Sequence, residues 1–187
     1  DGMGHGNQAA LESRQAVELL RMCLDAGYDR AQTLTAVNGM MLLAGQGERF
    51  TTVDLFLLDL WTGKASLDKL GAAGSYLMQA EGLSLLGGDA LPLGILENVE
   101  SGEKLMQLHQ GDTLILLSDG VEDAYENRQS MEETIRDALT LETAQDAANA
   151  ILTGAQSGDT APADDQTVLV LRLIRARVDA KIEEMYQ

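Results

Sequence analysis

The sequence predicts one domain of the α+β class, in which helices pack in layers against antiparallel strands. Three observations support this prediction. The 187 residues fit one domain, and an apolar share of 45% is enough for a sizeable core. Two segments with helical periodicity come first, and short strand-like segments separated by glycines follow. Helical periodicity then returns, and one last apolar strand comes after it.

The two leading helices are predicted from apolar periodicity and from terminal signals. Apolar residues recur at helical spacing over residues 11–24, and Gly27 is a natural stop. A second helix is predicted to begin at Asp29, because Gln32 three residues later completes a capping box. The glycines within residues 45–47 end this helix.

The middle of the chain is predicted to form strands connected by turns. Residues 51–60 are rich in strand formers, and residues 61–64 form the turn to a second strand. The apolar segments that follow are short and bounded by glycines, so they predict an antiparallel meander. In chain order, the strands expected after residue 60 cover 65–70, 75–79, 83–86, 103–108 and 113–117.

The last third of the chain is predicted to return to helix and then to strand. Ser130 and Glu133 predict a capping box at the start of one helix, and another helix is expected over residues 143–155. Residues 167–174 form the last apolar strand. Residues 175–187 are expected to form a charged helical extension of the domain.

The charge balance and the cysteine count exclude several classes of function. Thirteen Lys and Arg against 30 Asp and Glu give a net charge of −17, which argues against nucleic-acid binding and against docking on an anionic membrane. The same balance permits cation binding or a partner with a basic face. Cys23 is the only cysteine, so a reducing, cytoplasmic setting is expected. No apolar run of 18 residues predicts a membrane span.

Three acidic sites differ from the surface carboxylates expected on helix faces and in turns. Asp1 and Gly2 lie in a glycine-rich segment whose backbone could approach a ligand closely; a flexible loop is the alternative. Asp119 ends an apolar strand, where an unpaired carboxylate is costly; the alternative is a turn in which the next glycine is left-handed. Asp164 and Asp165 repel each other unless a cation intervenes; the alternative is an Asx turn.

Together, the three sites suggest a set of hard oxygen ligands, which suits Mg²⁺ or Mn²⁺ and not Zn²⁺. The side chains of Asp164 and Asp165 point to opposite faces of a strand, so one of them is expected to be the ligand. The spacing alone does not show that the sites converge. Other chemistry has less support, because the sequence lacks a Walker A motif and a Gly-x-Ser-x-Gly elbow. Cys23 and His109 are expected to be structural.

Five short motifs occur in a fixed order along residues 1–174. They are Asp1-Gly2-Met3-Gly4-His5-Gly6, Thr52-Val53-Asp54-Leu55, Leu91-Pro92-Leu93-Gly94-Ile95, Leu117-Ser118-Asp119-Gly120-Val121 and Asp164-Asp165-Gln166-Thr167-Val168. In this order they resemble the metal-dependent Ser/Thr protein phosphatases (type 2C, or PPM), in particular the bacterial branch typified by stage II sporulation protein E. Five ordered motifs are far more specific than any one of them.

The resemblance implies a sandwich of two antiparallel sheets flanked by helices, with two Mn²⁺ or Mg²⁺ ions at one end. It implies that Asp1 bridges both ions, that Gly2 ligates one through its carbonyl, and that Asp119 and Asp164 bind the other. Asp165 is the weaker candidate. Family members carry a further metal-binding Asp in strands upstream of the first motif. The resemblance therefore implies that N-terminal strands are missing here and that full activity needs residues before Asp1.

The activity implied by the resemblance is hydrolysis of phosphoserine or phosphothreonine on a partner protein, by a water activated between the two ions. In this branch the usual substrate is a phosphorylated anti-sigma factor antagonist, which connects the activity to sporulation and to sigma factor regulation. The two leading helices are expected to act as a regulatory element and could also support a homodimer. The domain could belong to a larger, membrane-anchored protein. The alternative function is a non-catalytic interaction module with the same fold.

Overall fold

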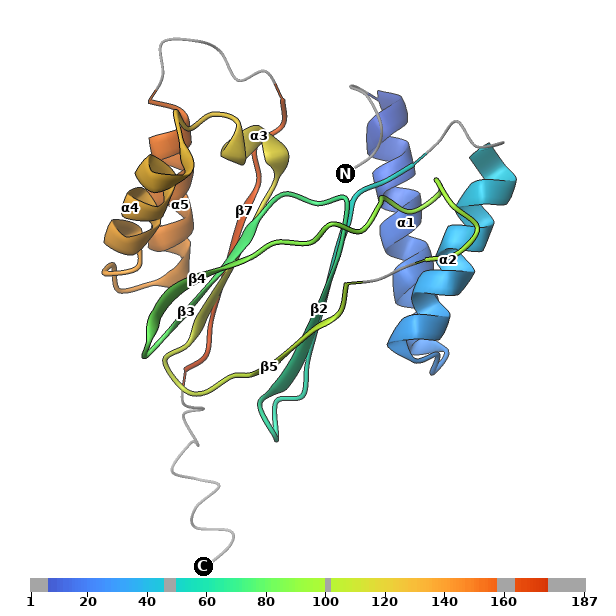
Figure 1. The fold of residues 1–187 in the computed structure, drawn as a ribbon, viewed down its shortest axis with the longest axis horizontal. Coiled ribbons are helices and arrows are strands. Elements are labelled where there is room, and N and C mark those ends of the chain that lie inside the picture. The colour runs from blue at the N-terminus through green and yellow to red at the C-terminus, as the bar shows by residue number, and fades with distance from the viewer. Residues whose placement is uncertain (1–6, 46–49, 100–101, 158–163, 175–187) are drawn as a thin grey trace, which may run out of the picture.

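The strands of the described residues form two antiparallel sheets (Figure 1). The structure is a computed structural model, and it describes residues 7–45, 50–99, 102–157 and 164–174. The first sheet has the strand order β1-β2-β5, with the bounds Val53–Leu58, Lys64–Leu70 and Lys104–Gln107. The second sheet has the order β4-β3-β6-β7, with the bounds Gly82–Leu86, Ser75–Gln79, Thr113–Leu117 and Val168–Arg172.

Helices α1 (Asn7–Asp25) and α2 (Arg30–Gly45) pack against the first sheet (Figure 1). The predicted capping box is confirmed: Asp29 N donates to Gln32 Oε1 at 3.0 Å, and Gln32 N donates to Asp29 Oδ1 at 2.8 Å. Apolar side chains from both helices and from β1 and β2 exclude water together, which stabilises this layer. Its buried residues are Leu20, Cys23, Leu34, Val37, Val53, Leu55, Leu70 and Leu93.

Helices α4 (Arg128–Ala138) and α5 (Ala144–Ala155) pack against the second sheet, and the short helix α3 (Asp119–Glu122) directly follows β6. Successive residues of a strand point to opposite faces. Tyr76 on β3 accordingly packs toward these helices, whereas the next residue, Leu77, packs between the two sheets. Both faces of the second sheet are therefore apolar, and the layers run helix, sheet, sheet, helix.

The two-sheet sandwich implied by the resemblance is confirmed, whereas three details predicted from the sequence are wrong. The strands do not form one meander, because β2 pairs with β5 and β3 belongs to the other sheet. Ser130 does not cap α4; Asn127 does, accepting from Ser130 N at 2.9 Å. Helix α3 stands where one of the two alternatives for Asp119 placed a turn. The predicted helix over residues 175–187 lies outside the described residues, so the division into domain and extension stays a prediction.

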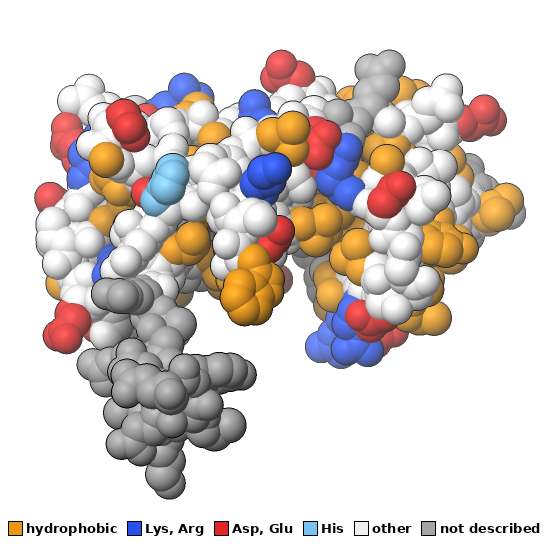
Figure 2. All heavy atoms as spheres, turned by 90° about the horizontal axis from the view of Figure 1, so that it is seen from below, with side chains coloured by type: hydrophobic (Ala, Val, Ile, Leu, Met, Phe, Trp, Pro, Cys, Tyr) orange, Lys and Arg blue, Asp and Glu red, His pale blue; other side chains and the backbone are white. Residues whose placement is uncertain are grey.

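The outer surface of α1 and α2 carries exposed hydrophobic side chains. Val17 is 61% exposed, Met22 63% and Leu43 87%. Figure 2 shows hydrophobic side chains gathered on this side of the molecule when it is seen from below. A homodimer formed through these helices stays a prediction. Among the residues that the structure describes, no helix combines the length and the apolar character that crossing a bilayer requires.

Candidate functional site

Asp119 lies where strand β6 passes into helix α3. The strand ends at Leu117, and Ser118 is the N-cap of the helix with extended backbone (φ −80°, ψ 160°). Asp119 is the first helical residue, and its Oδ1 accepts a hydrogen bond from Gly120 N at 2.9 Å. Asp119 is exposed, so the predicted costly burial of this carboxylate is wrong. The group is instead open to an ion from solution.

The segment that carries Asp164 and Asp165 is hydrogen-bonded to the same turn. Thr167 N donates to Ser118 Oγ at 2.9 Å, and Ser118 N donates to Thr167 O at 3.0 Å. Ser118 Oγ also donates to Asp165 O at 3.1 Å. These bonds extend the antiparallel pairing of β6 with β7 past its last strand residues. The two acidic segments therefore meet at one end of the second sheet.

Gly120 allows the two segments to approach closely. A Cβ atom at this position would lie 2.5 Å from Asp165 O, closer than a side chain tolerates, and 3.2 Å from Asp164 Cβ, which is a tight contact. The Gly120 carbonyl also accepts from Gln166 Nε2 at 3.1 Å. Gly120 has no positive φ, so the left-handed alternative is wrong. The glycine is needed for close packing rather than for backbone conformation.

The structure thus brings two of the three predicted acidic sites together. Asp119 and Asp165 are exposed, Asp164 is half-buried, and Asp164 Oδ1 accepts from Asp165 N at 2.8 Å. Asp1 and Gly2 lie outside the described residues, and their roles stay predictions. Within the described ranges, no group of three or more His, Cys, Asp or Glu is arranged to hold a metal ion. Asp119 and Asp164 supply hard carboxylate oxygens, which fit Mg²⁺ or Mn²⁺ but require further ligands.

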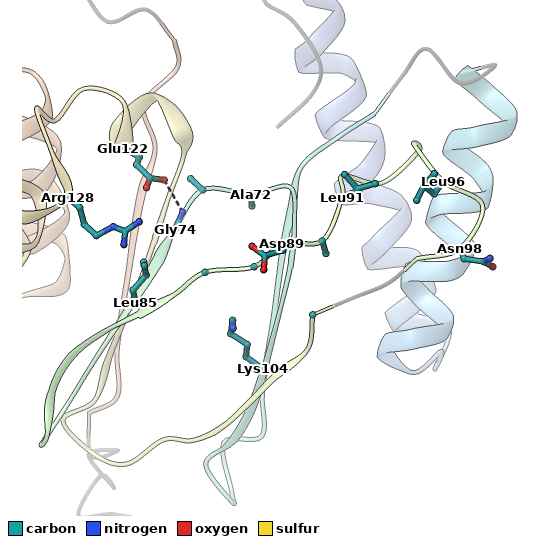
Figure 3. Close-up of a pocket in the computed structure, with 15 residues that line it drawn as sticks. Ala72, Gly74, Leu85, Asp89, Leu91, Leu96, Asn98, Lys104, Glu122 and Arg128 are labelled. Atoms are coloured by element: carbon teal, nitrogen blue, oxygen red, sulfur yellow. Dashed lines mark hydrogen bonds between the residues drawn. The ribbon is translucent and has the colours of Figure 1, made fainter.

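A cavity of about 910 Å³ opens beside this turn (Figure 3). Helix α3 contributes Glu122 to its wall, and Glu122 Oε2 accepts from Gly74 N at 3.0 Å. Because Gly74 directly precedes β3, this bond holds the entry to the second sheet against α3. The wall also carries three further charged side chains, Asp89, Lys104 and Arg128. The cavity therefore borders helix α3, which begins at Asp119.

A buried ion pair within the first sheet, which was not predicted, is hydrogen-bonded to the second sheet. Lys69 on β2 is 0% exposed, and its Nζ donates to Asp54 Oδ1 at 2.6 Å and to Oδ2 at 2.9 Å. The same Nζ donates to Ser75 Oγ on β3 at 2.9 Å. Burial raises the pKa of Asp54, although the hydrogen bond and the charge of Lys69 oppose the rise. The available signal was a charged residue within each of two apolar strands, which the register places opposite each other.

A second ionic cluster attaches helix α2 to the first sheet. Arg30, the first residue of α2, forms ion pairs with Asp68 on β2 and with Glu103 just before β5. The Nη2–Oε2 distance to Glu103 is 2.9 Å. Asp68 is 0% exposed, and its Oδ2 has no hydrogen-bond partner among the described residues. The guanidinium therefore holds the start of α2 on the sheet and compensates a buried carboxylate.

Comparisons with known proteins identify the family. The family model of stage II sporulation protein E (SpoIIE) matches residues 1–174. Two curated relatives, stage II sporulation protein E of Priestia megaterium and of Bacillus subtilis (strain 168), are each 31% identical over 121 residues. The aligned region covers 65% of this chain but only 21% and 15% of those proteins. The chain thus spans about a fifth or less of the relatives that it matches.

Solved structures show the same fold. The PP2C phosphatase domain with a fragment of the regulatory domain of SpoIIE from Bacillus subtilis superposes with a TM-score of 0.81 at 28% identity, covering 92% of this chain and 52% of that chain. The catalytic domain of the serine/threonine protein phosphatase PstP, in complex with two manganese ions, gives 0.75 at 21% identity, covering 94% and 86%. The RsbU and RsbW domains of a Mycobacterium tuberculosis protein give 0.78 at 20%, covering 100% and 56%. The last two likenesses concern the fold alone.

Proposed function

Because the chain belongs to the stage II sporulation protein E family, we propose that it hydrolyses phosphoserine or phosphothreonine on a partner protein with two divalent cations. The similarity to a PP2C phosphatase domain supports serine/threonine phosphatase function. The observation that carries the proposal is the contact between the Asp119 turn and the Asp164 segment at one end of the second sheet. The chain spans only part of the length of its relatives, so the activity of the whole protein is also proposed here.

The residues of this chain would bind and orient the cations. Asp119 and Asp164 would hold one cation, and Asp1 with the Gly2 carbonyl would hold the other, with Asp165 as a weaker candidate. When bound, Mn²⁺ or Mg²⁺ would lower the pKa of a water and neutralise charge on the phosphoryl oxygens. Ser118, which donates to the Asp164 segment and directly precedes Asp119 at the N-cap position of α3, would keep the two carboxylates in register. We include in this proposal that full activity needs residues upstream of Asp1.

A protein nucleophile is not needed for this chemistry. Cys23, the only cysteine of the chain, is buried in the layer between α1, α2 and the first sheet, where it cannot reach a substrate. The carboxylates of Asp119 after β6 and of Asp164 before β7 instead suit an arrangement in which water attacks phosphorus directly.

We further propose a phosphorylated anti-sigma factor antagonist as the substrate. Its support is the family membership of the chain. A non-catalytic interaction module is the competing function, and cation binding separates the two. The full-length protein should bind Mn²⁺ in a calorimetric titration if it is an enzyme. Failure to bind would favour the interaction module.

The decisive test is Asp119→Asn in the full-length protein. Replacing a carboxylate by an amide keeps the shape and removes the charge, so Mn²⁺-dependent release of phosphate from a phosphoserine protein should fall by about 100-fold or more. Asp123→Asn is a matched control, because Asp123 is exposed and follows the same helix. It should retain activity. Unchanged turnover in Asp119→Asn would remove Asp119 from its role.

A further inference from the structure

The cavity beside helix α3 differs in charge from the rest of the chain. The whole sequence has 30 acidic and 13 basic residues, whereas the cavity wall carries two of each. The acidic residues are Asp89 and Glu122, and Glu122 is engaged by Gly74 N. The basic residues are Lys104 and Arg128. Bound carboxylates would therefore meet less repulsion here than over most of the surface.

Lys104 and Arg128 reach this cavity from different layers. Lys104 begins β5 of the first sheet, and Arg128 begins α4 behind the second sheet. Figure 3 shows both side chains extending toward the space in front of Asp89 and Leu85. Among the described residues, neither cation forms an ion pair, whereas Arg21, Arg30, Lys69 and Arg136 do. Two cations that face one cavity and form no ion pair with any residue the structure describes constitute charge available to a ligand.

The remaining wall suits an extended peptide. Leu85 is 38% exposed and Leu91 51%, so apolar side chains lie beside the cations. Strands β4 and β5 each end their sheet, and both border the cavity through Leu85 and Lys104. The unpaired edge of a strand can add an extended segment by backbone hydrogen bonds. The volume of about 910 Å³ is enough for several residues of such a segment.

We propose that this cavity holds an acidic segment that flanks the phosphorylated residue of the protein substrate, with Lys104 and Arg128 paired to its carboxylates. The inference rests on the phosphatase function proposed above and adds the substrate class. Glu122 lines the cavity and ends the four-residue helix α3, which begins at Asp119, so the cavity wall lies one helical turn from the candidate metal site. Lys104 and Arg128 select the substrate and take no part in the chemical step.

The test compares two phosphoserine peptides that differ only in their flanks, one with Asp and Glu and one with Asn and Gln. In the full-length protein with Mn²⁺, the acidic peptide should have a KM about tenfold lower at similar kcat. The double variant Lys104→Glu/Arg128→Glu should lose this preference and keep its kcat on the neutral peptide. A peptide with Lys flanks should be preferred by the variant, because the charge has been reversed on both sides.

The matched control is Lys64→Glu/Arg136→Glu, which changes the net charge equally on a strand and on α4, away from the cavity. It should keep the preference for the acidic peptide. Equal KM values for the two peptides in the unmodified protein, or a preference that survives in the cavity variant, would overturn the inference while leaving the phosphatase function intact. No Mn²⁺-dependent release from any peptide would refute the phosphatase function and the inference with it.

Discussion

Gly120 is the residue on which the proximity of the two acidic segments depends. A methyl group there would meet the Asp165 carbonyl at 2.5 Å, and that atom belongs to the backbone, so the segment itself must move. We expect Gly120→Ala to weaken Mn²⁺ binding by about tenfold and to lower the free energy of unfolding by about 1–3 kcal/mol. Calorimetric titration and thermal unfolding of the full-length protein measure the two effects.

The control for this substitution is Gly39→Ala in helix α2. A Cβ atom at Gly39 meets nothing within 4 Å, so alanine should leave Mn²⁺ binding unchanged and slightly favour the helix. Identical Mn²⁺ affinities for Gly120→Ala and the unmodified protein would show that close packing at Gly120 does not position the carboxylates.

The Lys69–Asp54 pair makes a second residue-scale prediction. Lys69→Met leaves the Asp54 carboxylate without its cation in a place that is largely shielded from water, which should cost about 3–5 kcal/mol. The double variant Lys69→Met/Asp54→Leu should cost much less, because no unpaired charge remains. Urea unfolding of the unmodified protein, of the single variants Lys69→Met and Asp54→Leu, and of the double variant gives the double-mutant cycle. If Lys69→Met is no less stable than the double variant, the unpaired Asp54 carboxylate is not what destabilises the protein.

The pH dependence of the Lys69→Met variant follows from the sign of the pKa shift. Burial already raises the pKa of Asp54, and the variant removes the hydrogen bond and the charge that oppose the rise. A carboxyl group whose pKa is raised on folding contributes stability below its unfolded pKa and loses it as the pH rises through the folded value. The destabilisation of Lys69→Met should therefore be larger at neutral pH than at mildly acidic pH. Unfolding curves at both pH values measure the difference.

At the scale of elements, the contact between α2 and the first sheet depends on Arg30. Lysine has one ammonium group and cannot reproduce the fork that reaches Asp68 and Glu103 together. We expect Arg30→Lys to open α2 locally, which amide hydrogen exchange would detect as faster exchange over residues 30–45 than over β6. Arg21→Lys is the control, because the Arg21–Asp25 pair is exposed and should contribute little. Equal exchange in the two variants would exclude Arg30 as the anchor of α2.

Sequence patterns predicted the bounds of some elements correctly and missed others. Strands β3 and β6 begin and end at the predicted residues, because a short apolar run between glycines or turn residues is compatible with few structures other than a strand. The start of α4 was misplaced because Asn127 and Ser130 are both good caps and propensity does not rank them. Helix α3 was missed because four residues are too few to show a helical period.

At the scale of the whole molecule, cation binding should be visible as stability. A ligand that binds only the folded state raises the free energy of unfolding by about 2.7 kcal/mol at a concentration 100 times its Kd. We expect Mn²⁺ to stabilise the full-length protein by about this amount for each cation and to stabilise Asp119→Asn clearly less, because that variant loses one of the two proposed cation sites. Thermal unfolding with and without Mn²⁺ provides the measurement. Equal stabilisation of both proteins would place the bound ion elsewhere.

The sequence by itself determined the order and type of most elements, and through five ordered motifs it determined the family. Hydrophobic periodicity and turn-forming residues act over a few positions, so they can be recognised in the sequence itself. The tertiary structure alone decided which strands share a sheet, that the turn of Asp119 packs against the Asp164 segment at Gly120, and that Lys69 is buried against Asp54. These contacts join residues far apart in the sequence, and their energies arise from packing and desolvation that exist only once the layers have come together.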